Sequence, residues 1–141
     1  MGWVVIRFSE PKRIHRVVVY TVDSAKMPAR THGIRDLWLQ YVLETGEWMT
    51  VQRTDKTKKH NKNIIYENRL GRIVFNFKPL TTDKIRLAIL STNDMKRLSG
   101  YSSSYYRTQQ VEGTIRLLEI EAYGLQRAKT TMVDTQGTEV R

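Results

Sequence analysis

Residues 72–90 read RIVFNFKPLTTDKIRLAIL and contain two runs in which large apolar residues alternate with other residues. The alternating sets are Ile73, Phe75 and Phe77 in the first run and Ile85, Leu87 and Ile89 in the second. Successive side chains of a strand point to opposite faces, so each run predicts a strand with one buried face. Arg86 and Ala88 are expected on the opposite, solvent-facing side. The link between the runs contains Pro79 and two threonines, which are typical of a connection.

Five further runs are short, rich in β-branched and aromatic residues, and partly alternating. They cover residues 3–8, 14–20, 37–42, 48–51 and 115–123, which gives seven predicted strands in all. Trp38 and Trp48 lie in two of these runs and are expected to pack in the core or at a sheet edge. No window of eleven residues keeps a helical period. The pattern therefore predicts an all-β sandwich or barrel without helices.

The length, composition and motifs exclude several classes of protein and of functional site. At 141 residues the chain is long enough for one domain with its own core. The absence of cysteine excludes disulfides and thiolate metal sites, and no apolar run approaches the ~20 residues that a membrane span needs. The N-terminus shows no signal-peptide pattern, and no catalytic motif is present. Glu119 and Glu121, the two carboxylates that might pair in catalysis, alternate with apolar residues and indicate the solvent-facing side of the last strand. We therefore expect that the chain is not an enzyme.

The net charge of +10 raises the question of an anionic partner. Basic residues concentrate in residues 12–16, in residues 53–62 and after Gly124. Two interpretations stay open: basic loops that keep the domain soluble, and a face that binds phosphates.

Three long connections span residues 22–36, 53–70 and 91–113. Long loops on a rigid scaffold are where binding residues are usually found. The last connection contains the segment GYSSSYYRTQQ, residues 100–110, with three tyrosines among serines and glutamines.

The order of these motifs resembles a discoidin domain of the coagulation factor 5/8 type C family. The resemblance covers about residues 3–124, and its most specific part is the closing Leu118-Glu-Ile-Glu-Ala-Tyr-Gly124 after Thr81-Thr-Asp-Lys-Ile-Arg-Leu87. It implies a jelly-roll β-sandwich of the galactose-binding domain-like fold over residues 1–124, with 125–141 as a C-terminal tail or completing strand. Many members are non-catalytic carbohydrate-binding modules, and others bind phospholipid, collagen or DNA.

The resemblance also implies a ligand site in the end loops. An aromatic residue from the last long loop stacks on the sugar in carbohydrate-binding relatives, and Tyr101, Tyr105 or Tyr106 would take this role. Relatives further use a histidine, an arginine and an asparagine from earlier loops. By position these are His32, then Arg53, then Asn61 or Asn63. For each tyrosine the alternative is that its ring pins the loop onto the sandwich.

The chain departs from the family at its start, because the usual first strand and acidic calcium loop are missing. We therefore expect no calcium and no other cofactor. The edge left open is expected to pair with the tail, with a partner chain or with a parent polypeptide.

Three functions stay open at this point. The first is a carbohydrate-binding module in a larger extracellular or cell-surface protein, a location that rests on the resemblance alone. The second is a basic module for nucleic acid or an acidic polysaccharide, because tyrosines also stack on bases. The third is a structural domain that packs within a larger assembly.

Overall fold

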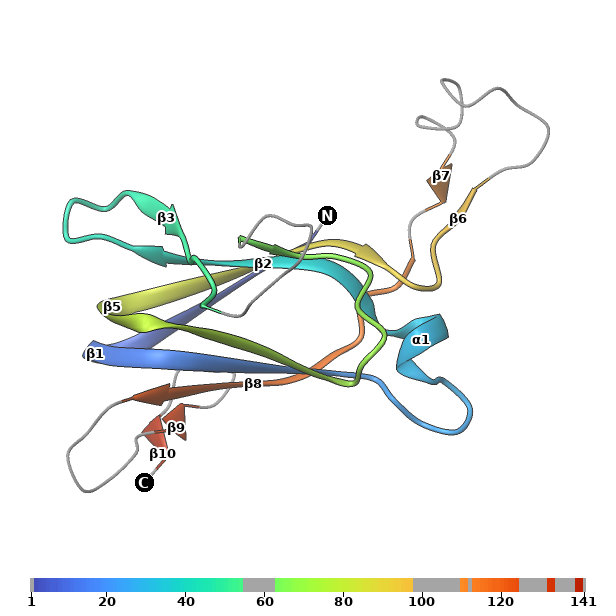
Figure 1. The fold of residues 1–141 in the computed structure, drawn as a ribbon, viewed down its shortest axis with the longest axis horizontal. Helices are drawn as coiled ribbons and strands as arrows, with labels where there is room; N and C mark the ends of the chain where they lie inside the picture. Colours follow the sequence, from blue (N-terminus) through green and yellow to red (C-terminus); the bar gives the residue numbers. More distant parts are fainter. Residues whose placement is uncertain are drawn as a thin grey trace.

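The computed structural model describes residues 2–54, 63–97, 110–111, 113–124, 132–133 and 139–140. They form a two-layered antiparallel β-sandwich with one short helix (Figure 1). The elements are β1 (Gly2–Thr21), α1 (Ala29–His32), β2 (Ile34–Val42), β3 (Trp48–Thr50), β4 (Ile64–Ile65), β5 (Arg72–Thr92), β6 (Lys96–Arg97), β7 (Gln110–Val111), β8 (Leu117–Gly124), β9 (Met132–Val133) and β10 (Glu139–Val140). The prediction of an all-β sandwich is confirmed.

Two long strands, β1 and β5, take part in both layers. They pair antiparallel from Gly2 opposite Ile89 to Tyr20 opposite Arg72. The sequence predicted two separate strands in each. They are continuous because the two backbones stay paired where they bend, at residues 9–13 of β1 and 78–83 of β5, which we call the corner. An irregularity in register between Arg7 and Lys12 lets the two strands bend together.

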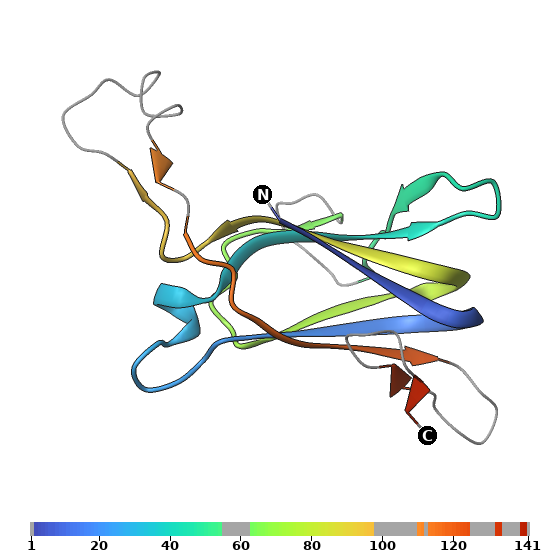
Figure 2. The same cartoon turned by 180° about the vertical axis from the view of Figure 1, so that it is seen from behind.

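The corner defines the layers. Residues 2–8 of β1 and 84–92 of β5 form the first layer with β2, β3 and β4, while residues 14–21 of β1 and 72–77 of β5 form the second with β8. Figure 2 shows the two layers from behind, joined at the corner and open toward α1. The corner and the loop end are thus opposite ends of the sandwich.

The core lies between the layers and follows the predicted alternation. Ile73, Phe75, Phe77, Ile85, Leu87 and Ile89 are all buried, together with Val17, Val19, Leu37, Leu39 and Ile120. Burial of each such side chain stabilises the fold by about 1.5–3 kcal/mol. Regular burial on one side of each strand confirms the expected inner face.

The outer face of the first layer differs from the expectation. Ala88 is buried there, because its register partners Trp3 and Trp38 stand on either side of it. The ring centres of Trp3 and Trp38 lie 6.4 Å apart with an edge-on arrangement. Trp38 therefore packs on the outer face of β2 and not in the core, and Trp48 lies on β3 at the end of the sheet.

The helix α1 contradicts the prediction of no helices. It is a single turn after Pro28, too short to produce a periodic pattern in the sequence. The backbone N–H of Ala29 donates to Asp23 Oδ1, and Ala29 is fully buried. In the tail, β9 pairs with Ala122 and Tyr123 of β8, so these residues extend the second layer.

Candidate functional site

Four connecting segments meet at the end of the sandwich that carries α1 (Figure 1). They are residues 22–33, 66–71, 92–95 and 113–116, and hydrogen bonds tie them together. The side-chain amide of Asn93 donates to the carbonyls of Ala29 and Asn68, both at 2.9 Å, and its backbone N–H donates to Gly33. Asn93 thus links three of the four segments. We call these four hydrogen-bonded segments at the loop end of the sandwich the platform.

Asp94 and Arg116 form an ion pair at the centre of this platform. Arg116 Nη1 lies 2.9 Å from Asp94 Oδ2 and also donates to the carbonyl of His32. Burial acts to raise the pKa of Asp94, but hydrogen bonds from Thr92, Arg116 and the backbone of Thr114 outweigh it and lower the pKa to about 2. The carboxylate is therefore charged at neutral pH and holds the last two segments together.

Gly113 lies against the same carboxylate. A Cβ at this position would overlap Asp94 Oδ1 and Thr92 Oγ1. The backbone can approach Asp94 this closely only because residue 113 has no side chain.

A second set of bonds fixes residues 66–71 to β2. The buried Asn68 donates from its amide nitrogen to the carbonyls of Ile34 and Leu70, and its amide oxygen accepts from the N–H of Leu70. Asp36 accepts hydrogen bonds from the N–H of Glu67 and from the hydroxyl of Ser91. Sequence reasoning did not select Asn68, Asn93 or Asp94, because their partners lie in distant loops.

Of the predicted site residues, His32 lies on the platform. It ends α1, is half-buried, and its Nδ1 is 2.8 Å from Thr31 Oγ1. Arg53 and Asn63 lie elsewhere, beside β3 and β4. Arg53 Nη2 donates to the carbonyl of Ile64, the residue after Asn63. The described contacts bring Arg53 and Asn63 near each other but do not join either to His32.

Asn61, Tyr101, Tyr105 and Tyr106 lie outside the described residues. The stem of the tyrosine loop is described, because Lys96 pairs with Val111 and Arg97 with Gln110. This β6–β7 ribbon projects from the loop end of the sandwich (Figure 1). The roles of all seven predicted site residues stay predictions.

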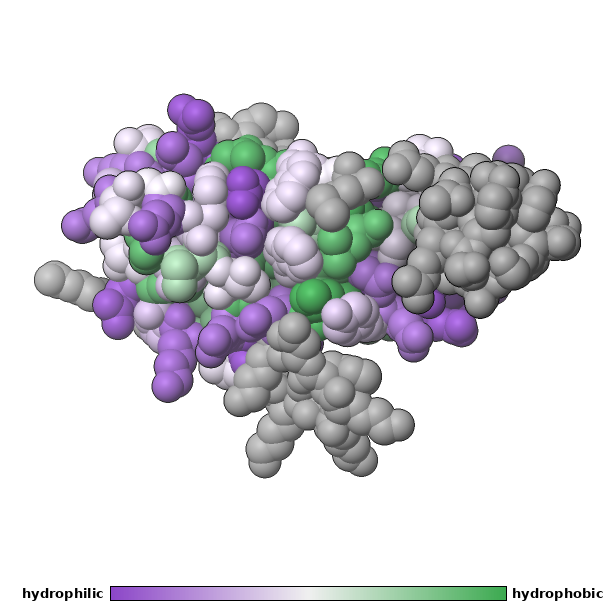
Figure 3. All heavy atoms as spheres, turned by 90° about the horizontal axis from the view of Figure 1, so that it is seen from above, coloured by the Kyte–Doolittle hydropathy of each residue, from purple (hydrophilic) through white to green (hydrophobic). Residues whose placement is uncertain are grey.

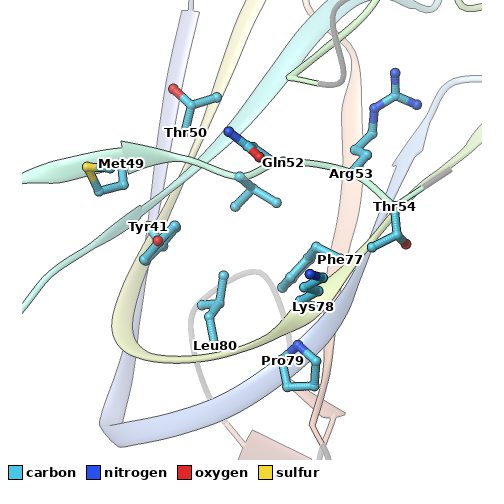
Figure 4. Close-up of a pocket in the computed structure, with 11 residues that line it drawn as sticks. Tyr41, Met49, Thr50, Gln52, Arg53, Thr54, Phe77, Lys78, Pro79 and Leu80 are labelled. Carbon is cyan, nitrogen blue, oxygen red and sulfur yellow. The ribbon is translucent and has the colours of Figure 1, made fainter. Parts of the chain in front are cut away.

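A pocket of about 440 Å³ opens at the side of the sandwich, between residues 49–54 and the corner of β5. Figure 4 shows Tyr41, Phe77 and Leu80 around it. Arg53 is the one predicted site residue among its eleven lining residues. No sequence pattern pointed to the other lining residues, because the pocket combines segments that are far apart in the chain.

The outer face of the first layer carries all three tryptophans of the chain. The guanidinium of Arg86 lies over the rings of Trp3 and Trp48, at 4.5 and 4.2 Å from their centres, and donates to Gln40 Oε1. Figure 3 looks down on this side of the molecule and shows hydrophobic residues among hydrophilic ones. Arg86 fills the space between two rings, so this face is packed and not hollow.

A comparison with solved structures finds the family 32 carbohydrate-binding module from Streptococcus pneumoniae EndoD. The TM-score is 0.60 at 18% sequence identity, and the match covers 87% of this chain and 69% of that chain. The fold is the galactose-binding-like jelly roll. No family model matches the sequence, and no curated protein matches it.

Two further observations concern the described part of the chain. No group of three or more histidine, aspartate or glutamate side chains there could hold a metal ion. No helix there is long and apolar enough to cross a membrane.

Proposed function

We propose that the chain is a non-catalytic carbohydrate-binding module of the discoidin type, which recognises glycans with the loops at the α1 end. The observation that carries this proposal is the likeness to a family 32 carbohydrate-binding module over 87% of the chain. In the same proposal the module belongs to a larger extracellular or cell-surface protein.

The loop platform supports the proposal physically. Asn93, Asn68 and the Asp94–Arg116 pair fix the loop bases, so little ordering of these segments remains to oppose ligand binding. Tyrosines supply aromatic faces for the C–H groups of a sugar at low cost in side-chain entropy. His32 lies on the same platform and offers a polar group.

The test is a glycan-array and affinity-gel screen of the chain beside a Tyr105→Ala/Tyr106→Ala variant. Loss of an aromatic stacking partner is worth about 1–3 kcal/mol, so we expect glycan binding to fall about 5- to 150-fold. Ser102→Ala/Ser103→Ala is the matched control, because it changes the same loop without removing a ring. Unchanged binding in the tyrosine variant would refute the end-loop site.

The rival function is binding of nucleic acid or an acidic polysaccharide, which the +10 charge favours. Binding through phosphates or sulfates weakens steeply with salt, whereas stacking on a neutral sugar changes little. The screen is therefore repeated at low and high salt with single-stranded DNA and heparin as competitors. Binding to these competitors alone, abolished by salt and indifferent to the tyrosines, would replace the proposed function with the rival.

A further inference from the structure

The side pocket is a preformed concavity. Its wall, residues 49–54, is fixed by backbone hydrogen bonds from Val51 to Leu39 and from Thr54 to Asn76, each 2.8 Å long, and by the bridge between Arg53 and Phe77. Its volume of about 440 Å³ lies within the range of small-ligand sites. A ligand would enter without rearranging the sandwich.

The lining combines the two kinds of group that a sugar needs. Tyr41, Phe77 and Leu80 form an apolar surface with two aromatic rings, and Figure 4 shows Leu80 directed toward the space beside Tyr41. Gln52 on the rim can donate and accept hydrogen bonds, and Thr54, whose hydroxyl donates to the carbonyl of Asn76, can accept one. An aromatic surface beside polar groups suits a ring with C–H groups on one face and hydroxyls at its edge.

The charge of the lining is one-sided. Its charged residues are Arg53 and Lys78, and none of the eleven lining residues is acidic. A smaller hollow of about 260 Å³, on the other side of the β5 corner, is lined by Glu44 and Asp83 as well as Lys84. The side pocket therefore attracts anions, while the smaller hollow carries both signs.

The two cations have different roles. Arg53 donates to the carbonyl of Ile64 and extends away from the space beside Tyr41 in Figure 4, so it supports the wall and contributes positive potential. Lys78 lies on the exposed corner of β5 and makes no ion pair within the described part of the chain. Its ammonium is the group that can reach an anion at the pocket mouth.

We propose that this pocket binds a sugar residue that carries an anionic substituent, a carboxylate or a sulfate. The inference rests on the proposed carbohydrate-binding function and adds a second subsite, distant from the α1 platform. Tyr41 would contact the ring, and Lys78 would form a charge-assisted hydrogen bond with the anionic group.

The test is a ¹⁵N–¹H NMR titration with four sugars that share one ring. Galactose, galacturonate, the methyl ester of galacturonate and galactose 6-sulfate differ only in the group at one carbon. We expect galacturonate or galactose 6-sulfate to shift the amides of Tyr41, Gln52, Thr54 and Lys78, and galactose and the ester to leave them unchanged. The two anionic probes distinguish a carboxylate from a sulfate.

Two variants assign the charge. Lys78→Gln should weaken the anionic sugar about tenfold, whereas Lys84→Gln, which removes the same charge from the smaller hollow on the same strand, should not. Tyr41→Phe keeps the ring and removes the hydroxyl, so binding should persist at close to the original affinity. Equal loss in both lysine variants would mean that only the net charge matters and would overturn the inference.

The outcomes separate this inference from the proposed function. Shifts at Gly33, Asn93 and Thr114 without shifts at the pocket amides would leave the carbohydrate-binding function standing and overturn the side subsite. Absence of shifts at the pocket with both anionic probes also overturns it. Pocket shifts that the neutral and anionic sugars cause equally would refute the role of charge.

Discussion

At the scale of single residues, the loop end depends on groups whose partners are remote in the chain. Asp94 receives hydrogen bonds from Thr92, Thr114 and Arg116, and Arg116 in turn reaches the carbonyl of His32. His32 was selected as a candidate from the sequence, but no sequence pattern indicated this network. The residues around Asp94 in the sequence do not reveal that an arginine 22 positions later forms an ion pair with it.

Replacement of Asp94 by asparagine should make the stability less dependent on pH. The folded-state pKa of about 2 lies below the ordinary value of 3.8, so the carboxylate contributes about 2 kcal/mol at neutral pH. That contribution is complete above the unfolded pKa and is lost as the pH falls from 3.8 through about 2. Urea unfolding should show Asp94→Asn less stable at neutral pH and equal to the parent near pH 2.

Glu44→Gln is the control for this measurement, because Glu44 is an exposed carboxylate in the turn between β2 and β3. Its unfolding free energy should stay within about 0.5 kcal/mol of the parent. A difference between Asp94→Asn and the parent that persists undiminished at the lowest pH would contradict the role of the charge.

At the scale of elements, local alternation predicts which face of a strand is buried but not what covers the other face. The period of two placed Ile85, Leu87 and Ile89 in the core correctly. The prediction that Ala88 faces solvent was wrong, because Trp3 and Trp38 cover it and come from strands far away in the sequence. Cross-strand neighbours depend on how two strands pair, so they cannot be read from the alternation within one strand.

A substitution of Arg86 tests how much the packing on this outer face contributes to the stability of the fold. Arg86→Met keeps the length of the side chain but removes the cation between two indole rings and both hydrogen bonds to Gln40. We expect a loss of about 1–2 kcal/mol in the free energy of unfolding, measured by urea denaturation with tryptophan fluorescence. Arg7→Met, at an exposed position on β1, should change it by less than about 0.5 kcal/mol.

At the scale of the whole molecule, order of motifs predicted more than any single motif. The alternating runs predicted a β-sandwich or barrel, and the resemblance carried by the order of the motifs implied the jelly-roll sandwich, which the structure and the comparison with a solved module confirm. The continuity of strands β1 and β5 was not predicted, because Ser9, Pro11 and Pro79 are residues that usually end a strand. Pairing between β1 and β5 across the corner keeps both strands continuous. The side pocket was missed for the same reason, since its walls meet only after folding.

The +10 charge makes a prediction for the whole molecule. The chain should be retained on heparin at low salt even if its ligand is a neutral glycan, and it should elute steeply as salt rises. Loss of retention at high salt together with unchanged glycan binding would separate the two kinds of interaction. Glycan binding that declines in parallel with heparin binding would show that a single ionic surface accounts for both.

Gly113 has a consequence for how such a module can change. Its bare backbone lets residues 92–94 and 113–116 close against one another at the base of the last long connection. Selection for a new ligand can then act on the intervening residues without disturbing the scaffold that presents them. The same closure makes this position suitable for inserting designed or randomised loops, much as antibody frameworks carry interchangeable loops.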